Sequence, residues 1–395
     1  MPQGLTLNKE NNLIPSWYFF WFLFSFVIFL VLFQILAVKL FEIIILSIIL
    51  FVVAFVIRNE KYKFLVLIVL LALLLASLRL IVNFSLNLED FNPFLSLREK
   101  TLEVLTKLYP EPMASFAKGL VVGSTNTKFD SSLYSFFQKT STSHLIAVSG
   151  FNITLIASFL NNFLKALTIN RKLSLVLSIF LTLFFVIFIG LPVSALRAWL
   201  MYFLIVVSQL VFRPNNFKIS LIFSLFFILN FSPEAIFDLS LQLSFLATFG
   251  LFYLAPILAN KFNFKENLPI LSKTLSETLG CYFMVLPLIL YNFGTMSLVG
   301  ILANLFAIPL IPIVTSLTFL TIIVYFISQN LALILAGLNS IILNFILKVI
   351  EFFGSLKFSA ITGFWPNISL IIAYYLLLIV FVFKDKKDYG IYREV

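Results

Sequence analysis

Long apolar runs separated by short polar connections constrain this chain of 395 residues more than any other feature of its sequence. The runs at 17–38, 41–57 and 64–78 approach or exceed the roughly 20 residues that a helix needs to cross about 30 Å of hydrocarbon. Hydrophobic residues make up 61% of the chain and charged residues 11%, and the mean hydropathy is +1.09. A water-exposed surface cannot accommodate that composition, so we expect an all-α polytopic integral membrane protein.

About twelve runs, within a range of ten to twelve, are predicted to cross the membrane. They lie near 17–38, 40–57, 64–82, 144–164, 173–190, 193–211, 218–231, 238–259, 277–292, 298–327, 331–350 and 367–383. The first run lacks the basic start and the cleavage site of a secretory signal, so we expect it to be retained as a helix. With the N-terminus in the cytoplasm, most lysines and arginines fall on the inner side, which accounts for most of the net charge of +10.

This topology divides the chain into four predicted regions. Residues 1–82 form N-terminal transmembrane helices, 83–143 an extracytoplasmic loop, 144–383 a transmembrane core, and 384–395 a cytoplasmic basic tail. Within the loop, the segments LREKTLEVLTKLYP and EPMASFAKGLVVG have the pattern of short amphipathic helices. We expect these two helices to lie at the membrane surface.

Metal and redox chemistry have little support in the sequence. The chain has one cysteine, Cys281, and one histidine, His144, which exclude an intramolecular disulfide and the usual zinc sites. We therefore expect no cofactor and no metal-dependent catalysis.

The run at 298–327 is too long for one simple crossing and contains Asn304, Pro309 and Pro312. Interrupted backbone at membrane depth is tolerated where protein buries it or water reaches it, so we expect a broken or re-entrant helix that lines a path. A proline kink packed between neighbouring helices is the simpler alternative.

Polar residues within the predicted spans form the candidate site. All of them fall in the outer half of the membrane, which predicts a polar vestibule: His144, Ser149, Asn152, Arg197, Asp238, Gln242, Ser244 and Asn304. Each also has a structural alternative. Small residues near Ser149 would let two helices touch, Arg197 would snorkel to the interface, and Asp238 would serve the first turn of its helix.

At these residues the chain resembles the ComEC competence-protein family. Four blocks carry the resemblance, in the family's order: HLIAVSGFNITLI, GLPVSALRAWLM, PEAIFDLSLQLSFLATFGL and LPLILYNFGTMSLVGILANLFAIPLIP. We refer to them as the first to fourth blocks. The sequence departs from the family at Asn152, where the family pattern has a second histidine, so a role that needs a proton or a metal at that position is doubtful.

The resemblance implies an inner-membrane channel for the uptake of single-stranded transforming DNA, with Arg197 meeting phosphates and aromatic rings meeting bases. The OB-like and metallo-β-lactamase-like nuclease domains of the family are not recognisable in this sequence, so we expect no nuclease activity of its own. The implied partners are single-stranded DNA, membrane lipid, a DNA receptor, a separate nuclease, a cytoplasmic translocation ATPase and further copies in a homo-oligomer. A secondary transporter or flippase for a small or lipid-linked solute is the competing class, and a structural scaffold is a third.

Overall fold

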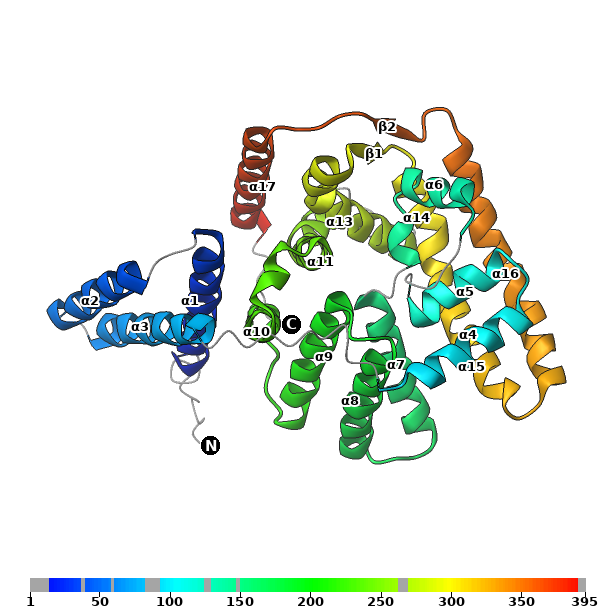
Figure 1. The fold of residues 1–395 in the computed structure, drawn as a ribbon, viewed down its shortest axis with the longest axis horizontal. Helices are drawn as coiled ribbons and strands as arrows, with labels where there is room; N and C mark the ends of the chain where they lie inside the picture. Colours follow the sequence, from blue (N-terminus) through cyan, green and yellow to red (C-terminus); the bar gives the residue numbers. More distant parts are fainter. Residues whose placement is uncertain are drawn as a thin grey trace, which may run out of the picture. The chain divides into compact units, whose positions relative to one another are not determined.

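The computed structural model describes residues 14–36, 40–57, 60–81, 93–123, 129–146, 150–261 and 269–389, which are almost entirely helical (Figure 1). They form two compact units, each described by itself. The first unit combines Met1–Leu88 with Leu196–Asp238, and the second combines Glu89–Ala195 with Leu239–Val395. The predicted all-α polytopic fold is confirmed.

Every predicted crossing contains a helix, but the helices differ in length. Eight stretches of the described residues are long and apolar enough to cross a membrane. They comprise α1 (Ile14–Leu36), α3 (Glu60–Ile81), α8 (Arg171–Phe188), α9 (Val193–Leu210), the continuous stretch Leu239–Lys261, α13 (Pro269–Phe293), the stretch Gly300–Tyr325 and α16 (Gln329–Ser355). The other crossings have shorter apolar helices: α2 (Leu40–Val56), α7 (Gly150–Ala166), α10 (Phe217–Phe231) and the apolar part of α17 (Ile368–Tyr389).

In the first unit, α1 packs against α3 and α10, and the rings of Phe26 and Phe226 meet edge to face at 4.7 Å between centroids. Arg79, in the last turn of α3, donates from Nε to the carbonyl oxygen of Asn230 and from Nη2 to that of Phe231 at 3.3 Å. These carbonyls belong to the last turn of α10, whose final oxygens have no partner within the helix. The guanidinium therefore caps α10, with its positive charge at the negative end of the helix dipole.

The second unit contains most of the helices and both strands. Before the core helices it has α4 (Leu95–Leu108), α5 (Met113–Val122), α6 (Ser131–Lys139) and the short 3₁₀ turn η3 (Ser143–Leu145). The stretch Leu239–Lys261 consists of α11 (Leu239–Phe249), the π-helical turn η5 (Gly250–Leu254) and α12 (Ala255–Lys261). Two three-residue strands, β1 (Thr295–Ser297) and β2 (Ala360–Thr362), pair antiparallel with Met296 opposite Ile361.

Helix α5 is buried among other helices, although its sequence has the pattern of an amphipathic helix with one exposed face. It packs against α4, α15 and α16 within the second unit (Figure 1), and eight of its ten residues are buried. Small residues explain the difference, because Ala114, Ala117 and Gly119 let neighbouring backbone approach closely. A Cβ atom on Gly119 would lie only 2.6 Å from the carbonyl oxygen of Ile146.

A second close approach joins the η5 turn to α13. A Cβ atom on Gly280 would lie 2.8 Å from the backbone nitrogen of Ala255, and one on Gly250 would lie 2.9 Å from the Cα of Cys281. The Sγ of Cys281 also donates to the carbonyl oxygen of Ala247 at 3.4 Å. The two membrane helices therefore touch backbone to backbone, as small residues permit.

Pro287 lies inside α13 and has no N–H to donate to the carbonyl of Phe283, four residues earlier. The hydroxyl of Tyr374, on α17, donates to that carbonyl at 2.9 Å, and Tyr375 donates to the next carbonyl, that of Met284, at 3.0 Å. In the absence of water a freed carbonyl must find a donor from another element. Helix α17 supplies that donor.

The stretch at 298–327 is interrupted at the predicted place, but only by one 3₁₀ turn, which fits the simpler alternative of a proline kink. A 3₁₀ turn, η6 (Ile308–Leu310), separates α14 (Gly300–Ala307) from α15 (Ile311–Tyr325), and Pro309 lies within it. The backbone keeps right-handed helical angles at Ile308 and Ile311, so the chain tightens by one turn and does not reverse.

Candidate functional site

The polar approach to α7 forms a turn and not the predicted helix start at residue 144. Helix α6 ends at Lys139, Ser141 has φ of 53°, and η3 precedes α7, which begins at Gly150. The Oγ1 atom of Thr140 donates to the carbonyl of Phe136 at 2.7 Å and lies 2.7 Å from the Oγ1 of Thr142. These local bonds lie where α6 ends and the turn begins. Residues 147–149, directly before α7, lie outside the described part of the chain.

His144 lies in this turn, with its side chain exposed. Its Nδ1 is 3.1 Å from the carbonyl oxygen of Ser141, a separation that fits a hydrogen bond when Nδ1 carries the proton. The neighbouring candidate Ser149 lies outside the described residues.

Asn152 is buried in the first turn of α7. Its Nδ2 donates to the carbonyl oxygen of Leu120 on α5 at 3.3 Å, which ties the two helices together. An amide can make this bond without titrating, so the position occupied by histidine in the family pattern serves here as a neutral donor.

The fourth block meets the turn that contains His144. Ser297, the last residue of β1, donates from Oγ to the carbonyl oxygen of Lys139 at 2.6 Å, and its own carbonyl accepts from the Tyr282 hydroxyl at 2.5 Å. A Cβ atom on Gly300, at the start of α14, would lie 3.0 Å from both the Cβ of Ser141 and the carbonyl oxygen of Thr140. We call this meeting of residues 139–144 with 297–300 the α6–α14 junction.

Asn304 lies one turn after Gly300 on α14 and is buried. Its Oδ1 has no hydrogen-bond partner among the described residues. The structure thus brings the fourth block against residues 139–141, directly before the first block. One turn further along α14 it leaves a buried polar atom available to a donor.

Asp238 and its neighbours occupy the connection between η4 (Pro233–Phe237) and α11. Asp238 immediately precedes the first residue of α11, and its N–H donates to the carbonyl of Ala235 at 3.0 Å. This position agrees with the structural alternative of a residue at a helix start. Gln242 and Ser244 follow on α11 and are half-buried, and the carbonyl of Ser244 accepts from Thr248 at 2.7 Å.

Arg197 lies on α9 and is only 7% exposed. Its Nη1 is 3.6 Å from the Sδ of Met201, one turn further along the helix. A snorkelling arginine would extend into the interface and be exposed, so its burial argues against that alternative. Its pairing with Asp238, and the vestibule, stay predictions.

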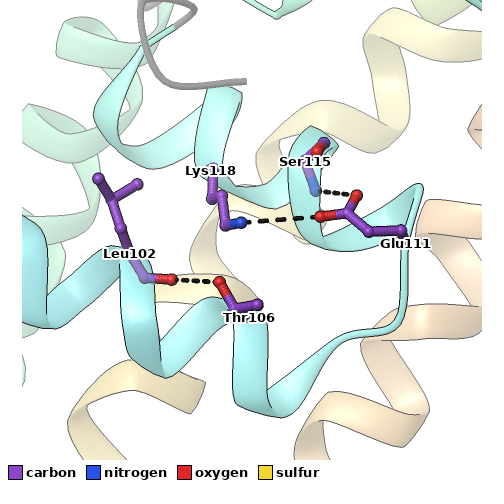
Figure 2. A network of polar contacts seen from close by, with 5 residues as sticks. All are labelled: Leu102, Thr106, Glu111, Ser115 and Lys118. Atoms are coloured by element: carbon purple, nitrogen blue, oxygen red, sulfur yellow. Dashed lines mark hydrogen bonds and ion pairs between the residues drawn. The ribbon is translucent and has the colours of Figure 1, made fainter. Parts of the chain in front are cut away.

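Sequence reasoning did not single out the ion pair of Glu111 and Lys118 at the start of α5. Figure 2 shows the Glu111 carboxylate between the two groups that it contacts: it accepts from the Ser115 N–H at 3.1 Å and lies 3.7 Å from the Lys118 Nζ. Lys118 is enclosed, with 14% of its side chain exposed. An acidic residue directly before an apolar helix was the available signal, because a carboxylate there interacts favourably with the helix N-terminus.

Metal ligands do not gather in the part of the chain that the structure describes. No group of three or more histidine, cysteine, aspartate or glutamate side chains is placed there to hold an ion. The site therefore offers hydrogen bonds and single charges.

Residues 120–387 match the Competence protein family, and this match covers more than half of the chain. The chain belongs to this family. It is also similar to ComE operon protein 3 of Bacillus subtilis (strain 168), with 30% identity over 216 residues, which are 54% of this chain and 27% of that protein. The chain thus matches about a quarter of this relative's length. No solved structure matches it.

Proposed function

We propose that this chain forms the membrane core of a DNA-uptake pathway in natural competence and passes single-stranded DNA into the cytoplasm. Its membership of the competence protein family carries the proposal. The α6–α14 junction adds support, because Ser297 and Gly300 of the fourth block contact the polar turn that leads into the first block, more than 150 residues earlier in the sequence. Residues that form the wall of one path are expected to meet in this way.

The side chains along such a path would act by binding and not by covalent chemistry. Arg197 would neutralise backbone phosphates, with a planar guanidinium that can donate two parallel hydrogen bonds. Asn304 and His144 would offer hydrogen bonds to a solvated strand, and aromatic rings would stack on bases whatever their sequence. A DNA receptor, a nuclease and a translocation ATPase would be supplied by other chains.

Transport in a purified system tests the proposal directly. The full chain is reconstituted in liposomes, fluorescent single-stranded oligonucleotide is added outside, and protected fluorescence is measured after external nuclease treatment. We expect protection of single-stranded oligonucleotide and none of the matched duplex. Equal protection in protein-free liposomes, together with the absence of oligonucleotide-induced current in planar bilayers, would reject a conducting core.

Variants of Arg197 separate conduction from folding. Arg197→Lys keeps a positive charge and should retain much of the transport, whereas Arg197→Gln should abolish transport while the protein inserts at normal abundance. If Arg197 and Asp238 form a structural pair, either single change should lower abundance, because a charge is left buried without its partner. The double variant Arg197→Gln with Asp238→Asn should have normal abundance whether Arg197 acts in conduction or in folding. It should transport DNA only if the role of Arg197 is purely structural.

We also propose that both termini and the 261–273 connection face the cytoplasm and that residues 83–143 face outward. In a Cys281→Ser background, an impermeant thiol reagent added to intact cells should label cysteine at Ser131 and spare cysteine at Lys273. Both positions are exposed, whereas Ser272 beside the latter is buried and unsuitable. The opposite labelling pattern would reverse the orientation.

A further inference from the structure

Five uncharged polar side chains are buried together where the end of α4 meets α15 and α16. We call this cluster the polar node, and it consists of Tyr109, Thr315, Thr318, Thr321 and Asn339. Asn339 is 0% exposed and Thr315 is 2% exposed, although the surrounding helices are apolar. Each polar atom in such a place needs a partner, because the bilayer supplies none.

Asn339, Tyr109, Thr318 and Thr321 already use every hydrogen that their side chains can donate. The Nδ2 of Asn339 donates to the Tyr109 hydroxyl at 3.0 Å and to the Oγ1 of Thr318 at 2.9 Å. The Tyr109 hydroxyl donates to the Oγ1 of Thr321 at 3.2 Å. Thr318 and Thr321 donate to carbonyls of their own helix, those of Val314 and Leu317.

This count leaves two buried atoms without a partner among the described residues: the Oδ1 of Asn339 and the Oγ1 of Thr315. The amide of Asn339 could also be placed with its oxygen and nitrogen exchanged. The atom without a partner would then be the nitrogen, which would lack acceptors, so one end of the amide is unsatisfied in either orientation. Thr315 lies one turn before Thr318 on α15, and Thr318 is bonded to Asn339. Thr315 is therefore about 4.5 Å along α15 from a side chain that is bonded to Asn339.

We infer that the node binds a water molecule between α15 and α16. The hydroxyl of Thr315 donates to the water, and the water donates to the Oδ1 of Asn339, so one molecule satisfies both atoms. Water can both donate and accept, and it therefore fits either orientation of the amide. An ion does not fit, because all five side chains are uncharged and a bare charge in the apolar interior is strongly disfavoured.

The bound water completes the attachment of α4 to the core. Tyr109 follows the last residue of α4 and reaches both Thr321 on α15 and Asn339 on α16. With the water in place, Asn339 is held from both ends of its amide, which fixes the direction of its bond to Tyr109. This site is independent of the proposed transport of DNA.

The sign of a stability change tests the inference. Thr315→Val removes the hydroxyl without a large change in shape. Among the described residues the hydroxyl has no hydrogen-bond partner, so the variant breaks no direct bond. If water is bound, the variant loses its partner and the melting temperature of the detergent-solubilised protein falls. If the node is dry, the variant removes an unsatisfied buried hydroxyl and the melting temperature stays the same or rises, which overturns the inference. Ser340→Ala is the matched control on α16, because the Ser340 hydroxyl is bonded to the Ala336 carbonyl.

Hydroxyl-radical footprinting of the reconstituted protein gives a second, independent readout. Radicals formed from a bound water modify adjacent side chains even when bulk solvent cannot reach them. We expect Tyr109 to be modified several-fold faster than Phe116, which is equally buried in the same unit, and Thr315→Val to abolish the difference. Equal rates for Tyr109 and Phe116 in the unaltered protein would show that no water is there.

Discussion

Replacing Gly250 with alanine tests the backbone contact between η5 and α13 at a single methyl group. The added Cβ would lie 2.8 Å from the Gly280 carbonyl carbon and 2.9 Å from the Cys281 Cα, and still closer to the Gly280 carbonyl oxygen. All three atoms belong to the backbone, so no side chain can rotate away and one helix must shift. Overpacking of this kind costs about 1–3 kcal/mol, and the better helix propensity of alanine offsets about 0.5–1 kcal/mol. We expect a net loss of about 1–2 kcal/mol, which lowers the ratio of folded to unfolded protein by about 5–30-fold.

Equilibrium unfolding in mixed detergent micelles measures this loss, and Gly337→Ala provides the matched control. Gly337 lies within α16, and a Cβ atom there would meet nothing within 4 Å. The same chemical change should therefore raise stability at Gly337 by about 0.5–1 kcal/mol, through backbone entropy alone. Opposite signs at the two glycines are expected. If Gly250→Ala were as stable as Gly337→Ala, the two helices would not be in backbone contact and the packing described for α13 would be wrong.

Three further outcomes are expected. Tyr374→Phe should destabilise the protein by about 1–3 kcal/mol, because the carbonyl of Phe283 loses its donor. Tyr375→Phe should lower the free energy of unfolding by less, because the carbonyl of Met284 still accepts from the helix N–H of Leu288. Equal losses for the two variants in the same unfolding assay would show that Pro287 does not leave the Phe283 carbonyl dependent on Tyr374. Asn152→Leu should lower the melting temperature, because the hydrogen bond from Asn152 to the Leu120 carbonyl of α5 is lost. An unchanged melting temperature would show that this bond does not stabilise the contact. Purified protein should show no metal-dependent DNA cleavage, and cleavage that disappears on mutation of this chain would refute that expectation.

The helical architecture was predictable because run length and hydropathy are local properties. Each predicted crossing contains a helix, and the break at Pro309 appeared where a residue without an N–H interrupts the pattern. The 3₁₀ turn at residues 143–145 was not predicted, because it depends on local backbone angles such as the positive φ of Ser141, which apolar periodicity does not report. The burial of α5 was also not predicted. Its sequence pattern looks amphipathic, and the sequence does not show which segment packs against its small residues.

The sequence selects candidate residues by their polarity, but it does not predict the contacts that they make. Asn152, Arg197 and Asn304 were selected for being polar within apolar runs, and all three are buried. Their partners could not be inferred, because a bond such as that from Asn152 to the Leu120 carbonyl depends on how two helices are rotated. The polar node escaped notice for the same reason: Tyr109 and Asn339 are bonded across 230 positions of sequence.

The tyrosine that supplies the missing donor at the proline of α13 has a consequence for how substitutions in this protein are judged. The chain has 50 phenylalanines and 13 tyrosines, and the two rings fill nearly the same volume. At Tyr109, Tyr282, Tyr374 and Tyr375, however, the hydroxyl bonds an atom on a different element. A single oxygen atom at each of these positions connects two segments. Replacing one of these tyrosines with phenylalanine is usually regarded as a mild change. Here we expect it to be more damaging than replacing a lipid-facing phenylalanine with leucine.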